Sequence, residues 1–185
     1  MLKAKIAGAV AAGLMLLSTQ AFAQQANDPQ NTLVMKLKDG TVLIHLRPDI
    51  APKHAERLKT LASKHFYDGL KFHRVIAGFM AQTGDPKGDG TGGSDLPDLK
   101  AEFSKVPFTR GVVGMARSSD PNSANSQFFI TYADAPFLNG QYTVVGEVVS
   151  GMDAVDKIKK GPEADNGMVP NPDKIITLRV AADEK

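Results

Sequence analysis

The sequence has 185 residues, of which 22 are Lys or Arg and 20 are Asp or Glu, and it contains no cysteine. This length predicts a single domain. The formal net charge of +2 argues against a nucleic-acid-binding protein, which needs a clustered excess of basic residues. The lack of cysteine excludes disulfides, thiol nucleophiles and thiolate metal sites.

The first 23 residues differ from the rest of the chain. Lys3 and Lys5 precede an apolar run from Ile6 to Leu17, and Ala21-Phe22-Ala23 follows it. A basic segment, a short apolar segment and an A-x-A site are typical of a secretory signal peptide, and the run is shorter than the ~20 residues that span a bilayer. The alternatives are a core helix or an uncleaved anchor. We expect residues 1–23 to be removed, which leaves a periplasmic protein without membrane attachment.

A β-hairpin is expected near the start of the mature chain. Apolar and polar residues alternate over 32–37 and over 41–46, and the Asp39-Gly40 pair between them is a strong hairpin signal. The expected organisation is a flexible lead-in at 24–31, one domain at 32–182 and a tail at 183–185.

A helix is expected after the hairpin. Asp49 is an N-cap candidate, and Pro52 would lie in the first helical turn. Apolar residues then recur at helical spacing until the helix ends near Lys64. These residues are Ala51, Ala55, Leu58, Leu61 and Ala62.

The rest of the chain predicts six further strands, a glycine-rich loop and a second helix. The strands are expected at 71–76, 79–83, 111–116, 127–132, 142–149 and 175–180, the loop at 84–99, and the helix at 152–159. About eight short strands with one helix near each end favour an antiparallel barrel or sandwich.

Several common kinds of site do not match the sequence. The run Gly84–Gly93 lacks the order of a phosphate-binding loop, and no helix pattern follows it. The four histidines include no pair at the i, i+4 spacing of metal ligands, and no G-x-S-x-G motif is present. We therefore predict neither a metal nor a cofactor.

One arginine stands out because it lies in an apolar strand. Arg74 is flanked by Phe72, Val75 and Ile76. Taken alone, it is equally well explained as an exposed residue on the polar face of a strand. The segment Ser126–Ile130 also places aromatic residues beside an amide, and together the two segments favour a functional groove.

The segment Phe72–Asp85, with the sequence FHRVIAGFMAQTGD, closely resembles the central signature of the cyclophilin family of peptidyl-prolyl isomerases. The resemblance extends over roughly residues 32–182. It implies a closed eight-stranded antiparallel β-barrel capped by two α-helices, and an enzyme that acts on proline-containing unfolded or extended polypeptides. Further motifs follow in family order at Gly90–Gly93, Gly114–Ala116, Asn125–Ile130 and Phe137–Gly140.

The resemblance also implies roles for single residues. Arg74 falls on the catalytic arginine of the family and Gln82 on its glutamine partner. The implied substrate-binding positions are Phe79, Met80, Phe129 and Leu138 in the proline pocket, Gln127 and Arg117 in the groove, Gly90, Ala116 and Ser118 at the neighbouring pocket, and Phe137 and Tyr142 at the far rim.

These residue types suit the reaction. Rotation about an X-Pro bond breaks amide resonance and meets a barrier of ~18–20 kcal/mol. An apolar pocket can hold the proline ring, and a guanidinium can donate to the imide nitrogen, whose lone pair exists only in the twisted state. No bond is made or broken, so this chemistry needs no nucleophile, metal or cofactor.

The sequence departs from many eukaryotic members at three positions of the groove. Phe137 and Tyr142 replace a tryptophan and a histidine, as in bacterial exported members. Because phenylalanine lacks the indole N–H that contacts cyclosporin, we expect weak cyclosporin binding. Arg117 replaces a small polar residue, which predicts a shift towards acidic substrates. The overall expectation is a monomer that assists folding of exported proteins, and the alternative is a proline-binding chaperone with little turnover.

Overall fold

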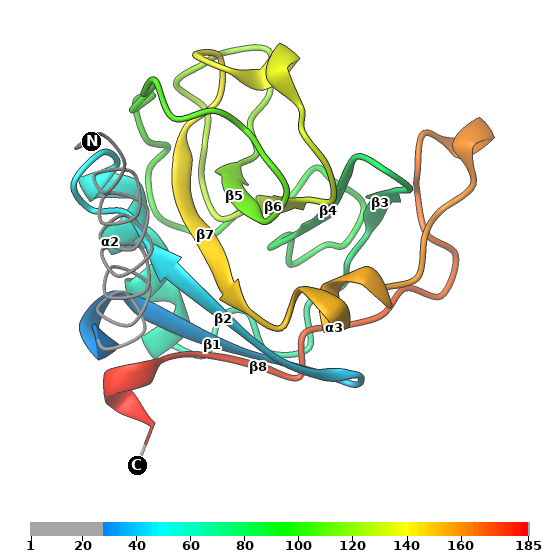
Figure 1. Ribbon diagram of the computed structural model, residues 1–185, viewed down its shortest axis with the longest axis horizontal. Coiled ribbons are helices and arrows are strands. Elements are labelled where there is room, and N and C mark those ends of the chain that lie inside the picture. Colours follow the sequence, from blue (N-terminus) through cyan, green and yellow to red (C-terminus); the bar gives the residue numbers. More distant parts are fainter. Residues whose placement is uncertain (1–27, 185) are drawn as a thin grey trace, which may run out of the picture.

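The computed structural model describes residues 28–184, so the expected signal peptide lies outside the described residues. Figure 1 shows a strongly curved sheet with α2 at one end and α3 at the other. The strands are β1 (Thr32–Leu37), β2 (Gly40–Leu46), β3 (Arg74–Ile76), β4 (Met80–Thr83), β5 (Val112–Met115), β6 (Phe128–Thr131), β7 (Val144–Ser150) and β8 (Thr177–Val180). The helices are α2 (Pro52–Ser63) and α3 (Met152–Asp156), with 3-10 turns η1 (Pro29–Asn31), η2 (Pro136–Leu138), η3 (Glu163–Asp165) and η4 (Ala181–Asp183).

Within residues 28–184, all eight strands form one antiparallel sheet with the order β3-β4-β6-β5-β7-β2-β1-β8. The register shifts where β7 meets β2 and where it meets β5. Such irregularities bend a sheet, and this one curls into a half-barrel (Figure 1). The edge strands β3 and β8 do not pair with each other in the described part of the chain. A closed ladder, as implied by the family resemblance, is therefore not found; instead, an isolated bridge between Lys71 and Lys174 joins the two margins.

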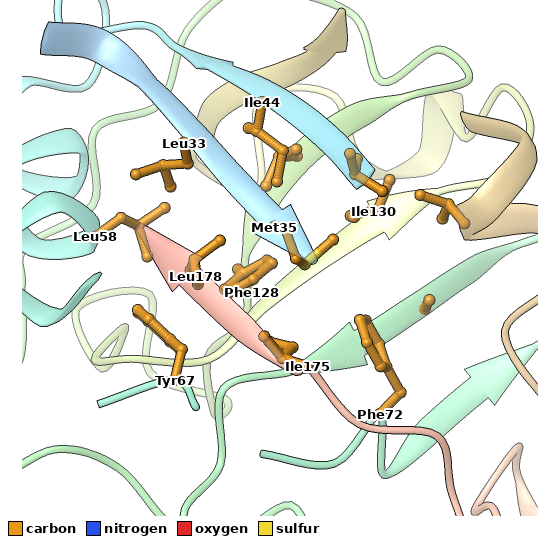
Figure 2. Packing of buried hydrophobic residues seen from close by; sticks show 14 of the residues in the cluster. Leu33, Met35, Ile44, Leu58, Tyr67, Phe72, Phe128, Ile130, Ile175 and Leu178 are labelled. Atoms are coloured by element: carbon orange, nitrogen blue, oxygen red, sulfur yellow. The ribbon is translucent and has the colours of Figure 1, made fainter. Parts of the chain in front are cut away.

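The main hydrophobic core fills the hollow of the sheet. Figure 2 shows Leu33 of β1, Leu58 of α2 and Leu178 of β8 around the same interior. Burial of such side chains stabilises the fold by about 1.5–3 kcal/mol each. Tyr67 is fully buried among them, and its hydroxyl donates to the Ser126 carbonyl at 3.0 Å. The hairpin and α2 thus contribute to one interior, and α2 lies against β8 and β7.

Helix α2 buries all five apolar residues that predicted it, but it begins differently from the prediction. Asp49 does not cap the helix, because the N-cap position is Ala51, whose side chain offers no acceptor. The Glu102 carboxylate takes that role instead. It accepts hydrogen bonds from the backbone N–H groups of Lys53 and His54 at 3.1 Å each. Periodicity located the helix, whereas its cap comes from a distant loop.

A second, smaller core cluster supports one face of the sheet away from α2. It contains Met80, Phe108, Phe129 and Leu138, all nearly inaccessible to solvent. The Phe108 and Phe129 rings stack with centroids 5.7 Å apart. This cluster fixes β4, β6 and η2 relative to one another.

Several element boundaries differ from the sequence-based expectation. Strands β3 and β4 are shorter than predicted, and α3 ends at Asp156 rather than Lys159. Asp28 was expected in a flexible lead-in, but its carboxylate accepts from the backbone N–H of Asn31 and caps η1. Between residues 28 and 184, no helix has the length and apolar character needed to cross a membrane.

Candidate active site

Arg74 and Gln82 lie directly opposite each other on β3 and β4. Directly opposed residues of an antiparallel pair project to the same face, and Arg74 Nη1 donates to Gln82 Oε1 at 3.4 Å. Partial burial lowers the pKa of Arg74 from its ordinary value, but arginine remains protonated in proteins. The strand register therefore holds a permanent cation beside an amide.

A chain of side-chain amides extends from Arg74 to the glycine-rich loop. Gln82 Nε2 donates to Gln127 Oε1 at 2.9 Å, and Gln127 Nε2 donates to the carbonyls of Gly90 at 3.1 Å and Gly92 at 2.8 Å. Because a carbonyl only accepts hydrogen bonds, the nitrogen of Gln127 must face the loop. Its oxygen then faces Gln82, and the oxygen of Gln82 faces Arg74. The loop thus fixes the orientation of both amides.

The loop is itself organised around Asp85, which is 1% exposed. Its carboxylate accepts from the backbone N–H groups of Lys87 at 2.8 Å, Asp89 at 3.1 Å and Gly90 at 2.6 Å. Burial raises the pKa of Asp85, but these backbone hydrogen bonds outweigh it, so the pKa lies below its usual value. Sequence reasoning missed this role. The available signal was an aspartate at the start of a glycine-rich run, because Asp readily bonds to backbone N–H groups just after it.

Asn166 is a second residue that sequence reasoning missed. It follows η3 and has a left-handed conformation, with φ 51° and ψ 34°. Its backbone oxygen accepts from Arg74 Nε and its Oδ1 accepts from Arg74 Nη2, both at 3.0 Å. The guanidinium is therefore held on one side by Gln82 and on the other by Asn166.

Beside the guanidinium lies a groove with apolar walls and a volume of about 430 Å³. Met80, Phe129 and Leu138 reach it from the second core cluster. Phe137 is 61% exposed, and its ring centroid lies 5.2 Å from that of Phe79. A pocket with these apolar side chains in its lining thus adjoins the Arg74 guanidinium.

Arg117 lies where this groove meets a second, polar pocket of about 480 Å³, and it lines both. Its guanidinium sits 4.4 Å from the centroid of the Tyr142 ring. It also donates to the backbone oxygens of Ser118 at 2.8 Å and Gln141 at 3.0 Å. Within residues 28–184 no carboxylate forms an ion pair with it. Arg117 therefore brings a cationic side chain, and not only its backbone, to the groove.

Every site residue expected from the sequence lines one of these two adjoining pockets. The apolar groove is lined by Arg74, Phe79, Met80, Gln82, Ala116, Arg117, Phe129, Phe137, Leu138 and Tyr142. Gly90, Ser118 and Gln127 line the polar pocket, which also shares Gln82, Ala116 and Arg117. Gln141, which the sequence did not single out, also lines the apolar groove. No group of three His, Asp or Glu side chains in the described part of the chain is placed to hold a metal ion.

The chain matches a single family over almost all of its described length. The model of the "Cyclophilin type peptidyl-prolyl cis-trans isomerase/CLD" family matches residues 32–180. A Brucella suis protein named "Probable peptidyl-prolyl cis-trans isomerase" is 65% identical over 171 residues, which cover 86% of this chain and 87% of the relative. A peptidyl-prolyl cis-trans isomerase of Acinetobacter baylyi is 39% identical over 183 residues, covering 93% of this chain and 94% of that protein.

Solved structures give the same result. A cyclophilin from Hirschia baltica superposes with a TM-score of 0.76 at 27% identity, covering 85% of this chain and 76% of that chain. A Cryptosporidium parvum cyclophilin-type isomerase, crystallised in the presence of the dipeptide Ala-Pro, gives a TM-score of 0.73 at 27% identity, covering 80% and 98% of the two chains. Sequence, fold and the composition of the groove agree: this chain belongs to the cyclophilin-type peptidyl-prolyl cis-trans isomerases.

Proposed function

We propose that this chain isomerises X-Pro bonds by holding the proline ring in the apolar groove while Arg74 donates a hydrogen bond to the imide nitrogen. The observation that carries the proposal is the position of the Arg74 guanidinium on the rim of a groove walled by Met80, Phe129 and Leu138. These three apolar side chains offer the proline ring a surface that needs no hydrogen bond. In this proposal the amide nitrogen of the bound proline faces the Arg74 guanidinium, which lines the same groove.

The physical basis is a difference between two states of the substrate. In the planar amide the nitrogen lone pair is delocalised and accepts hydrogen bonds poorly, whereas in the twisted amide it is localised. A donor placed at that nitrogen therefore stabilises the transition state more than the ground state, which is the condition for catalysis. A charged donor in a partly water-excluded groove gives a stronger bond than a neutral one in water.

The groups around Arg74 support this role because they do not neutralise it. Within residues 28–184, its side chain donates to the amide oxygen of Gln82 and to two oxygens of Asn166, all formally neutral. Within residues 28–184 no carboxylate forms an ion pair with Arg74. A guanidinium oriented by neutral acceptors keeps its full charge for the substrate.

The test is a protease-coupled proline-isomer assay on the native chain and on Arg74→Ala. We expect Arg74→Ala to lose about 100-fold or more in kcat/KM, the usual cost of removing a donor that stabilises a transition state, with an unchanged melting temperature. A native chain that binds proline peptides and suppresses aggregation but leaves the isomerisation rate unchanged would instead establish the chaperone alternative.

We further propose that the protein acts in the periplasm on exported polypeptides. The support is the order of Lys3 and Lys5, the apolar run and Ala21-Phe22-Ala23, which is the pattern of a cleavable signal. Mass spectrometry of the protein recovered from the periplasm should find Gln24 as the first residue. An intact Met1 on protein retained in the cytoplasm would contradict this proposal.

A further inference from the structure

Asn166 contacts Arg74 through an unusual combination of backbone and side chain. Arg74 offers five N–H donors in a planar fork, and Asn166 takes one from Nε with its backbone oxygen and one from Nη2 with Oδ1. This is the edge that a carboxylate would occupy in a bidentate ion pair. Asn166 reproduces the two acceptors without the negative charge.

The turn that carries Asn166 is attached to the outer edge of β3. Val75 N donates to the Gly167 carbonyl at 2.7 Å, and Gly161 N donates to the Val75 carbonyl at 2.9 Å. A Cβ on Gly167, which has φ +78°, would collide with Ile76 Cγ1. Two backbone hydrogen bonds therefore tie the turn to the edge strand, and they place Asn166 beside Arg74 independently of its own exposed side chain.

The residue type at position 166 meets two requirements together. Its φ of 51° lies in the left-handed region, which residues other than glycine adopt rarely and Asn more readily than most. Glycine would accept that backbone but has no Oδ1. Aspartate would supply the oxygen but would neutralise the guanidinium.

We propose that Asn166 is a positioning residue for catalysis, which holds the Nε and Nη2 edge of Arg74 so that the remaining N–H groups face the peptide with the charge intact. The inference rests on the proposed function of Arg74. Asn166 makes no contact with the substrate in this account; it acts through the guanidinium alone.

Two variants separate orientation from charge. Asn166→Gly keeps the left-handed backbone and the carbonyl acceptor but removes Oδ1, and we expect kcat to fall about fivefold, the effect of one lost hydrogen bond on a barrier, with KM unchanged. Asn166→Asp keeps the geometry and adds a charge, and we expect kcat/KM to fall by about tenfold or more, because a neutralised guanidinium stabilises the twisted amide less.

The chain offers a matched control in Asn171. It lies in the same segment, also has a left-handed conformation with φ 52°, and has no hydrogen bond to Arg74. Asn171→Gly and Asn171→Asp should leave kcat and KM at the native values. Melting temperatures of all four variants show whether any loss comes from unfolding.

The decisive experiment makes the same two Asn166 substitutions in the Arg74→Ala variant. If Asn166 acts only through Arg74, Asn166→Gly and Asn166→Asp should cause no further loss in that background. Native kcat in Asn166→Gly, or an equal further loss without Arg74, overturns the inference while leaving the proposed function standing. A native chain without isomerase activity would instead remove the proposed function itself.

Discussion

The two sides of the groove are built by different kinds of interaction. The apolar side is a continuation of the second core cluster, in which Met80, Phe129 and Leu138 pack together. The opposite side is a row of polar groups, in which Arg74 and Gln82 are oriented by hydrogen bonds. One side owes its shape to packing, and the other owes its orientation to a chain of donors and acceptors.

Because of this difference, the two sides of the groove should respond differently to amino-acid substitutions. A packed wall is supported by many small contacts, so a single substitution of similar volume leaves the pocket in place. In the polar row, single hydrogen bonds link Gln127 to Gln82 and Gln82 to Arg74, so we expect a change at Gln127 to alter the orientation of Arg74. We therefore expect polar substitutions to affect catalysis and apolar ones to affect which ligands the groove accepts.

The largest effect is expected for Arg74→Lys, which retains the positive charge and removes the planar set of N–H donors. Lysine cannot satisfy Gln82 Oε1 and both oxygens of Asn166 with one ammonium group in the same geometry. We predict a loss in kcat/KM of about 100-fold, close to that of alanine, measured by the protease-coupled assay. Near-native activity in this variant would show that charge alone suffices and that the polar chain has no role in orientation.

On the apolar side, Phe137→Trp tests ligand choice. Phe137 is exposed at the rim and has no donor to offer an inhibitor, whereas tryptophan would present an indole N–H. We predict that cyclosporin inhibits the native chain weakly and the variant about tenfold more strongly, the gain of one good hydrogen bond. Equal potency of cyclosporin against both proteins would refute this reading of the rim.

A substitution in the middle of the polar chain should have an intermediate effect. Gln127→Leu removes the acceptor for Gln82 and the two bonds to the loop carbonyls. Gln82 is then free to turn its nitrogen towards Arg74, and we predict a fall in kcat of about fivefold. Gln141→Leu is the control, because among residues 28–184 the Gln141 Nε2 group donates only to the Phe137 carbonyl. Equal losses in both variants would show that general disturbance of the groove, and not amide orientation, is responsible.

A smaller effect is expected where the two pockets meet. Arg117 carries a charge that no carboxylate of the described chain neutralises by an ion pair, so it should favour acidic residues near the proline. We predict that Arg117→Asn lowers the ratio of kcat/KM for Glu-containing over Lys-containing peptides by about threefold at low salt, with less change at high salt. A ratio that stays constant would restrict Arg117 to its contacts with Tyr142 and the nearby carbonyls.

The smallest expected effect is on the pH dependence of stability. It concerns His54, which belongs to the scaffold and not to the groove. Burial lowers the pKa of His54, and the hydrogen bond to Glu102 raises it. The effect of burial is the larger, so the pKa lies below its usual value. Below about pH 6.5, His54 therefore takes up a proton in the unfolded chain more readily than in the folded chain. The contribution of neutral, buried His54 to the free energy of unfolding is present above that pH and is lost on acidification.

His54→Gln should reduce the fall in melting temperature between about pH 7.5 and about pH 5. The fall should not vanish, because burial also lowers the pKa of His73. Native kcat measured over the folded range should stay flat, since Arg74 does not titrate there. An unchanged slope in His54→Gln would show that His54 is not a source of the acid sensitivity.

The sequence predicts features that depend on neighbouring residues better than features that depend on residues far apart in the chain. Alternation and periodicity located the hairpin and α2 because they depend on residues close in sequence. The family motif brought Arg74, Gln82 and the apolar residues into one groove. Asn166 and the cap by Glu102 were missed because each bonds to a residue at least 48 positions away, and such pairs leave no local pattern.

The closed barrel that the family resemblance implies is not shown by the strand pairing, in which β3 and β8 form no ladder within residues 28–184. Strand counting shows how many strands are available but not whether β3 and β8 meet in register. In the structure their margins are joined by the isolated bridge Lys71–Lys174 and by single backbone bonds such as Phe72 N to the Asp173 carbonyl. Whether two edges form a ladder depends on the bend of the whole sheet, which no local segment encodes.

The most direct measurement is a crystal structure of the chain with a bound Ala-Pro peptide. The account predicts the proline ring against Met80, Phe129 and Leu138, with a guanidinium N–H of Arg74 directed at the prolyl nitrogen and both bonds to Asn166 retained. A proline ring seated in the polar pocket beside the glycine-rich loop, or an Arg74 side chain turned away from the peptide towards solvent, would contradict it.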